Sequence, residues 1–401
     1  MALEARIAKK ISELRAKGDV PLAIELWNGK RYALADRTSV TLRIPGAKAL
    51  RHFVRPDLAA LGEAYVEGDI DVEGPIDEAL RAAEALARQL DRPAKGRLPL
   101  FRPRHSKKRD AEAIRYHYDV SNDFYALWLD RRMVYSCAYF RNGGEDLDAA
   151  QEQKLDHICR KLRLKPGERL LDIGCGWGAL VLWAAERYGA QATGITLSEN
   201  QRALADERIR AAGLSSRCQV LLQDYRDVQG EGVFDKIASV GMFEHVGLKN
   251  LPLYFGAIRR LLAEGGIALN HGITSVDPES RDVGLGAGEF VEKYVFPHGE
   301  LPHLSLVVKE MGAAGLEVMD VETLRLHYAR TLAQWSRRLE QHLDRAREYS
   351  GDKRLRIWRV YLAGCAYAFE RNWVTIQQVL AVKADNPARN PLPWTREFMY
   401  R

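Results

Sequence analysis

Short apolar runs alternate with helix-like stretches along residues 168–273, and this alternation constrains the fold more than any other feature of the chain. The apolar runs are RLLDIG, QATGIT, CQVLLQ, FDKIASV and GGIALNHGI, and helical periodicity marks 179–188, 199–212 and 251–262. Strands that alternate with helices are typical of a mostly parallel, doubly wound sheet. We therefore predict an α/β fold of Rossmann-like type, whose ligands bind at the carboxyl ends of the strands.

A different pattern precedes this region. Residues 1–91 predict a small mixed N-terminal domain, with an amphipathic first helix and short alternating segments near 24–27 and 40–44. Residues 92–110, called the basic segment below, combine eight cationic side chains with three prolines and predict a linker. Residues 111–401 then form the predicted catalytic domain. A chain of 401 residues is long enough for two domains.

The basic segment is either a solvated linker or a contact surface for anionic partners. Its cations are Arg92, Lys95, Arg97, Arg102, Arg104, Lys107, Lys108 and Arg109. Near an anionic lipid surface each Lys or Arg contributes on the order of 1 kcal/mol. No helix-turn-helix, zinc finger or aromatic RNA-binding motif accompanies the segment, so we expect no nucleic-acid partner.

Membrane spans and metal sites are not indicated by the sequence. No apolar run reaches the ~18 to 20 residues of a transmembrane helix, and no signal-peptide core opens the chain. We expect a cytoplasmic protein. The five cysteines are an odd number without CxxC spacing, which argues against a disulfide framework and against zinc.

The first predicted strand runs into a glycine-rich turn, LDIGCGWG at 171–178. Glycines such as Gly174, Gly176 and Gly178 let the backbone approach a ligand closely. Asp172 precedes the turn, where a carboxylate can meet the cationic amino group of an amino acid. This arrangement suits S-adenosylmethionine better than a pyrophosphate, although a tight structural turn needs no ligand at all.

The next two strand ends carry polar groups suited to ribose and adenine. The second is followed by Thr196, Leu197, Ser198 and Gln201, and the third by Asp224, Tyr225 and Arg226. Many nucleotide-binding folds place a carboxylate at the second strand end, where this chain has Thr196. We therefore expect the hydroxyl of Thr196 and the amide of Gln201 to hold the ribose.

Motifs over nearly the whole chain resemble the cyclopropane-fatty-acyl-phospholipid synthase family, which includes the mycolic acid cyclopropane synthases. They are YHYDVSNDFYALWLD, YSCAYF, LDIGCGWG, GITLSENQ, QDYRDV, GMFEHVG, FVEKYVFPHGELP and HYARTLAQW. The resemblance implies a class I S-adenosylmethionine methyltransferase fold and a homodimer. It also implies cyclopropane formation across the cis double bond of an unsaturated phospholipid acyl chain, at the inner face of the membrane. The N-terminal domain resembles the extra domain of the phospholipid-acting members.

The resemblance also implies roles for individual residues. Contacts with S-adenosylmethionine fall on Tyr135, Ser136, Asp172, Gly174, Cys175, Gly176, Trp177, Gly178, Thr196, Leu197, Ser198, Gln201, Asp224, Tyr225 and Arg226. The positions that bind a bicarbonate ion correspond to Cys137, Glu244, His271, Ile273 and Tyr328, with Cys137 and Ile273 contributing backbone groups. Cys365 matches a cysteine assigned to the family's active site.

The implied chemistry explains these residue types. An alkene is a weak nucleophile, so it must be held against the sulfonium methyl without water. Methyl capture leaves a carbocation, and the new methyl must lose a proton to a nearby base before the ring closes. Bicarbonate can supply that base while its charge stabilises the cation. His271 and Tyr328 can donate hydrogen bonds to the anion, and Glu244 can orient it.

Several alternatives remain open at this stage. Lone His and Tyr residues in apolar stretches are often satisfied core groups, and Cys365 in LAGCAYAFE can be a small buried hydrophobe. Aromatic residues in 290–296, with Tyr361, Tyr367 and Phe369, line either an acyl channel or ordinary core. Alternative functions are a fatty-acyl methyltransferase with a methylene- or methyl-branched product, an amine N-methyltransferase, and a non-catalytic lipid-binding protein.

Overall fold

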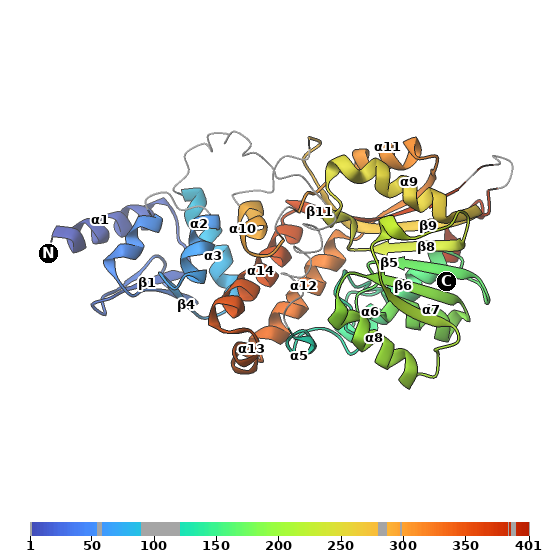
Figure 1. Cartoon of the computed structure of the whole chain (residues 1–401). Helices are drawn as coiled ribbons and strands as arrows, with labels where there is room; N and C mark the ends of the chain where they lie inside the picture. Colours follow the sequence, from blue (N-terminus) through green and yellow to red (C-terminus); the bar gives the residue numbers. More distant parts are fainter. Residues whose placement is uncertain are drawn as a thin grey trace. The chain divides into compact units, whose positions relative to one another are not determined.

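The computed structural model describes residues 2–53, 58–89, 121–279, 287–296, 299–383, 385 and 390–400. The chain divides into two compact units, drawn in Figure 1. The first comprises Met1–Arg102, Val283–Pro297 and His342–Tyr367, and the second Pro103–Asp282, His298–Gln341 and Ala368–Arg401. The basic segment and the predicted boundaries at its two ends lie outside the described residues.

The first unit contains a four-stranded sheet in the order β2-β1-β3-β4. Its strands are β1 (Leu22–Leu26), β2 (Arg31–Ala33), β3 (Val40–Ile44) and β4 (Asp71–Glu73). β1 and β3 are parallel, whereas β2 and β4 add antiparallel edges. The accompanying helices are α1 (Ala2–Lys17), η1 (Ala47–Phe53), α2 (Leu58–Val66) and α3 (Ile76–Gln89). The alternating segments predicted near 24–27 and 40–44 thus correspond to β1 and β3.

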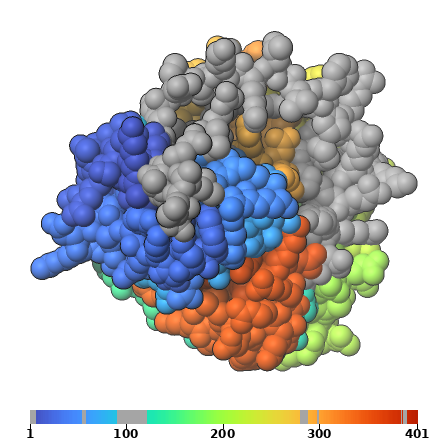
Figure 2. Space-filling model, turned by 90° about the vertical axis from the view of Figure 1, so that its left-hand side faces the viewer, coloured from blue at the N-terminus to red at the C-terminus, as the bar shows by residue number. Residues whose placement is uncertain are grey.

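Later parts of the chain complete the first unit. They are α10 (Ala287–Tyr294), α13 (Leu343–Ser350) and most of α14 (Asp352–Glu370). Lys353 of α14 donates to the carboxylate of Glu67 at 2.9 Å, and Arg356 donates to the carbonyl of Tyr65 at 3.1 Å. Figure 2 shows this orange surface directly against the blue N-terminal residues. The sequence contained no signal for this long-range association.

The second unit is built on a seven-stranded sheet in the order β10-β11-β9-β8-β5-β6-β7. Its strands are β5 (Arg169–Ile173), β6 (Gln191–Thr196), β7 (Cys218–Leu222), β8 (Phe234–Val240), β9 (Leu262–Ser275), β10 (Glu317–Thr323) and β11 (Val374–Val382). The five strands from β9 to β7 run parallel, and β11 runs antiparallel to β9 and β10. This order confirms the predicted mostly parallel, doubly wound sheet.

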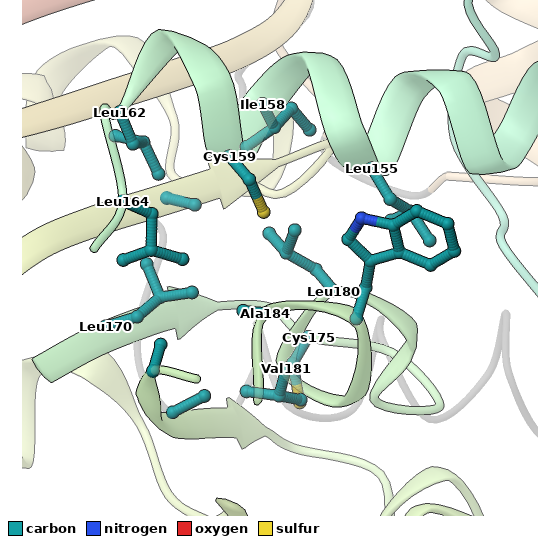
Figure 3. Close-up of a cluster of buried hydrophobic side chains, with 14 of the residues drawn as sticks. Leu155, Ile158, Cys159, Leu162, Leu164, Leu170, Cys175, Leu180, Val181 and Ala184 are labelled. Atoms are coloured by element: carbon teal, nitrogen blue, oxygen red, sulfur yellow. The ribbon is translucent and has the colours of Figure 1, made fainter. Parts of the chain in front are cut away.

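Helices cover both faces of this sheet because successive strand residues face opposite sides. Leu170 belongs to a core with α6 (Leu147–Lys161), α7 (Ala179–Tyr188) and α8 (Glu199–Ala211), whereas Leu171 packs with α9 (Leu251–Leu261) and α11 (Leu304–Ala313). Figure 3 shows the first of these cores, where side chains from α6 and α7 meet Leu170. The unit also contains α5 (Asn122–Ala126), η2 (Tyr225–Asp227), η3 (Phe243–His245), η4 (Leu248–Asn250), α12 (Arg325–Glu340) and η6 (Glu397–Met399). Among the helices that are described, none is long and apolar enough to cross a bilayer.

Candidate functional site

The glycine-rich turn connects β5 to α7, at the carboxyl edge of the sheet. Gly174, Gly176 and Gly178 have φ values of 80°, 54° and 79°, a region that L-residues with side chains rarely adopt. A Cβ on Gly174 would lie 2.8 Å from the Cβ of Met242, whereas a Cβ on Gly176 would meet no described atom within 4 Å. The backbone at Gly176 is therefore open to close approach by a ligand.

Asp172 lies at the end of β5 with a carboxylate that is buried and incompletely paired. Its side chain is 3% exposed, and its Oδ1 has no hydrogen-bond partner within the described chain. Burial raises the pKa of Asp172 to about 7, against the opposing influence of Lys154. A buried carboxylate of this kind is stabilised by a cationic partner. The ammonium group of S-adenosylmethionine fits this requirement.

The second strand end is organised by hydrogen bonds among its own residues. Thr196 donates from its hydroxyl to Oε1 of Gln201 at 2.8 Å and accepts from the N–H of Ser198 at 3.2 Å. Ser198 caps α8 by accepting from the N–H of Gln201 at 3.3 Å. Leu197 is half-buried in the same turn. Thr196 and Gln201, expected to hold a ribose, thus also hold each other in place.

The third strand end is likewise held in place by contacts among its own residues. Arg226 donates to both carboxylate oxygens of Asp224, at 2.8 and 2.7 Å, and its guanidinium lies 5.5 Å from the ring centre of Tyr225. Tyr225 is itself buried edge-on against Tyr254, with ring centres 5.4 Å apart. The strand end therefore presents a rigid aromatic and charged surface.

Glu244 reaches the sheet through η3, which follows β8. Gly272 of β9 makes this possible, because a Cβ there would lie 1.9 Å from the ring of Phe243. In the resulting close packing, Oε1 of Glu244 accepts from the N–H of Ile273 at 2.7 Å. Its Oε2 is buried and has no partner in the part of the chain that the structure describes. Burial raises the pKa of Glu244 to about 7, although the Ile273 bond opposes this shift.

His271 lies beside Val240, the last residue of β8, and directly across from Gln378 of β11. The amide nitrogen of Gln378 lies 3.2 Å from Nδ1 of His271, so Nδ1 must accept this hydrogen bond. Burial holds the pKa of His271 well below its ordinary value, and the ring is therefore neutral. Its proton then resides on Nε2, which is buried without a described partner.

The segment at Tyr135, Ser136 and Cys137 is held by polar side chains of α6. Gln151 donates to the carbonyl of Ser136 at 2.9 Å, and Lys154 donates to the Ser136 hydroxyl at 2.9 Å. The sulfur of Cys137 lies 3.8 Å from the carbonyl oxygen of Leu324. Burial raises the pKa of the Cys137 thiol, which therefore stays protonated.

Aromatic packing joins three of the predicted site residues. Tyr135 lies 5.8 Å from Tyr125, which lies 5.0 Å from Trp177, measured between ring centres. On its other side Tyr135 packs against Trp335 at 5.3 Å, and Trp335 meets Tyr328 at 6.0 Å. Tyr135, Trp177 and Tyr328 thus belong to one apolar cluster, which is suited to exclude water.

The structure brings most of the predicted site residues to one edge of the sheet. Met242 touches the turn at Gly174, and a Cβ on Gly241 would lie 3.8 Å from that of Ser136. Cys175 is buried at the turn, with its sulfur beside Gly194 of β6. No group of three or more His, Cys, Asp or Glu in the described ranges is arranged to hold a metal.

Cys365 and the expected channel residues other than Phe369 belong to the first unit. Cys365 lies on α14 in the first unit, is half-buried, and has a pKa that burial raises to about 12. At neutral pH this thiol is protonated and is not a nucleophile. In the same unit, Phe290 packs on Gly62, and Tyr367 bonds to Glu84. Phe369 packs against Tyr328, with ring centres 4.7 Å apart.

Sequence reasoning missed the residues that support this site, chiefly Gln151, Lys154 and Gln378. Gln151 and Lys154 were detectable, because they interrupt the buried stripe of α6 where apolar residues are expected. A charge in such a stripe indicates a polar site beneath it. Gln378 was not detectable, since its role depends on the register of β11 against β9.

Comparison with known proteins gives a consistent result. Residues 105–379 match the family described as mycolic acid cyclopropane synthetase, and residues 11–92 match a domain of unknown function. A "probable fatty acid methyltransferase" of Pseudomonas putida is 51% identical, over 95% of this chain and 97% of that protein. The cyclopropane-fatty-acyl-phospholipid synthase of Escherichia coli strain K12 is 34% identical, over 90% and 92%. The crystal structure of mycolic acid cyclopropane synthase CmaA1 complexed with SAH and CTAB aligns with a TM-score of 0.65 and 33% identity, covering 71% of this chain and 99% of that one.

Proposed function

The chain is an S-adenosylmethionine-dependent methyltransferase of the mycolic acid cyclopropane synthetase family, and on this basis we propose that it forms a cyclopropane ring across the cis double bond of an unsaturated phospholipid acyl chain. One observation carries the proposal. Two buried polar atoms have no described partners: Oε2 of Glu244, in η3 just after β8, and Nε2 of His271, which lies within β9 opposite the last residue of β8. An acceptor and a donor of this kind suit a small protonated anion.

The residues divide the chemistry between them. Bound S-adenosylmethionine supplies an electrophilic methyl group, for which Asp172 and the Gly174–Gly178 backbone form the cradle. A bicarbonate ion would be held by the His271 donor and the Glu244 acceptor, and would take the proton released by the new methyl group. The Ile273 N–H, expected to serve this anion, already donates to Glu244. The aromatic cluster around Tyr135 and Tyr328 keeps water from the carbocation.

A second candidate, a fatty-acyl methyltransferase with a methylene- or methyl-branched product, is favoured by the name of the 51% identical relative. The two functions share methyl transfer to an acyl double bond and diverge only in how the cation is resolved. The name of the Escherichia coli relative supports phospholipid as the substrate class. We further propose a cytoplasmic homodimer that associates peripherally with the inner face of the membrane.

Variants of Glu244 and His271 test the proposed anion site. We expect Glu244→Gln and His271→Ala to lower transfer of labelled methyl to unsaturated phospholipid vesicles by about 10²- to 10⁴-fold. Cofactor affinity should stay near that of the wild type, and added bicarbonate in degassed buffer should stimulate only the wild type. His303→Ala, which removes an N-cap of α11, is the matched control and should lower stability but not the bicarbonate response.

The opposite pattern would refute the proposed site. If Glu244→Gln and His271→Ala melt at lower temperature but retain turnover per folded molecule, these residues are only polar groups of the core. Equal bicarbonate stimulation of wild type and both variants would exclude them as ligands of the anion.

A further inference from the structure

Lys154 is a buried lysine without a described counter-ion in contact. Its side chain is 2% exposed, and Nζ donates to the hydroxyl of Ser136 at 2.9 Å. No ion pair joins it to a carboxylate among the residues that the structure describes. Burying an ammonium group without a paired anion is strongly unfavourable. The lysine therefore requires a reason beyond packing.

Two buried aspartates act on this ammonium group, and only one of them is satisfied. The carboxylate of Asp130 accepts from the N–H groups of Val134 at 2.7 Å and Arg132 at 2.9 Å. Asp172, by contrast, has an oxygen without a described partner. Asp130 is thus occupied in its own turn, whereas the Asp172 carboxylate remains available to a ligand.

Apart from Asp130, the other titratable groups near Lys154 and Asp172 are neutral at physiological pH. Cys137 and His271 lie within electrostatic range of Lys154, and Cys159 and Cys175 lie within that of Asp172. Burial raises the pKa of each of these thiols and lowers the pKa of His271. The charge balance around Asp172 therefore depends on Lys154.

We propose that Lys154 is a positioning residue for the methyl donor, which fixes the Ser136 hydroxyl and keeps the Asp172 carboxylate charged for the donor's amino group. The proposal rests on the proposed function, because it takes Asp172 and Ser136 as cofactor contacts. Gln151 completes the arrangement by donating to the carbonyls of Val134 at 3.3 Å and Ser136 at 2.9 Å. One face of α6 thus holds the whole segment in place.

Electrostatics indicates how this arrangement works. Burial lowers the pKa of Lys154 to about 8, so the amine is still mostly charged at pH 7. Its charge opposes the effect of burial on Asp172, whose pKa would otherwise lie above its present value of about 7. A protonated Asp172 cannot attract an ammonium group by charge. Removal of Lys154 should therefore raise the pKa of Asp172, and cofactor affinity should then be lost at a higher pH.

The test is the pH dependence of S-adenosylmethionine binding, measured by calorimetry on the full chain between pH 5.5 and 9. Wild-type affinity should fall as the pH drops below about 7. In Lys154→Met the midpoint should rise by about one unit, with binding about fivefold weaker at pH 7 and about tenfold weaker at pH 5.5. Lys154→Gln keeps a donor for Ser136 and loses only the charge, and should show the same shift even where Lys154→Met folds poorly.

Lys161→Met is the matched control. Lys161 is a second buried lysine of α6, but it is paired with Glu322 at 2.5 Å. This variant should lose thermal stability and keep the wild-type midpoint. Weakening of Lys154→Gln by the same factor at every pH, or no weakening, would overturn the proposal while leaving the proposed function intact. Absence of wild-type binding at every pH would overturn both.

Discussion

At the scale of single residues, Asp172 combines a functional role with a cost to stability. Its pKa of about 7, against an ordinary value of 3.8, means that the fold disfavours the charged form. A carboxyl whose pKa is raised on folding destabilises the protein increasingly as the pH rises from its unfolded pKa to its folded pKa. The penalty from Asp172 is thus absent below about pH 3.8 and complete above about pH 7.

We therefore predict that Asp172→Asn stabilises the ligand-free protein while abolishing cofactor binding. The gain in unfolding free energy should be on the order of 4 kcal/mol at pH 8 and should shrink toward pH 4. Denaturant titration at both pH values measures it. Asp235→Asn is the control, and it should destabilise at pH 8, because hydrogen bonds from Arg169 lower the pKa of Asp235 and favour its charged form. A less stable Asp172→Asn protein at pH 8 would contradict this view.

At the scale of elements, the turn between β5 and α7 depends on glycines for different reasons. Gly174 needs space because of Met242, whereas Gly176 faces an opening. Gly176→Ala should therefore fold with a loss of about 1 kcal/mol from its positive φ, and S-adenosylmethionine affinity should fall at least about tenfold. Gly213→Ala is matched to it, with φ of 67° and equally open space at the end of α8. Equal cofactor affinity in both variants would show that the ligand does not pass Gly176.

The elements also show what the sequence could reveal. The helices expected at 179–188, 199–212 and 251–262 correspond to α7, α8 and α9, because their apolar periodicity is local. β10 and β11 were not predicted, since their pairing brings together residues far apart in the chain. β9 spans Leu262–Ser275 and so extends beyond both ends of the apolar run predicted at 265–273.

Local sequence patterns and long-range pairing also separate the site residues that could be predicted from those that could not. Asp172 was found from sequence because it precedes a glycine-rich turn in a local strand-end pattern, and Glu244 was found through the family resemblance. Their partners were not, because Lys154 reaches Ser136 across packed elements and Gln378 meets His271 only through strand register. Family resemblance supplied the role of Tyr328, for which a lone tyrosine in a helix gives no local signal.

At the scale of the whole molecule, charge is the property that bears on a membrane surface. The net charge of +6 is modest, but the basic segment concentrates eight cations within 92–110. Exposed charges act within a Debye length of ~8 Å at physiological ionic strength. If this segment contacts headgroups, binding to anionic vesicles must weaken as salt increases.

Neutralising Arg102, Arg104, Lys107 and Lys108 together to glutamine should weaken binding to anionic phospholipid vesicles and flatten its salt dependence, at about 1 kcal/mol per contacting charge. Co-sedimentation at two salt concentrations measures this. A variant with the same charge change at the exposed Arg202, Arg210, Arg217 and Lys309 is the control. Equal binding by both variants would make the basic segment a plain linker.

In the proposed reaction, the transferred methyl carbon becomes part of a cyclopropane ring on an acyl chain. The direct measurement is mass spectrometry of phospholipids after incubation of the purified protein with S-adenosylmethionine and cis-unsaturated vesicles, before and after catalytic hydrogenation. We expect acyl chains that are heavier by one CH2 group and take up no hydrogen, because ring closure removes the double bond. Heavier chains that still take up hydrogen would indicate a methylene branch, and unmodified chains would contradict methyl transfer to phospholipid.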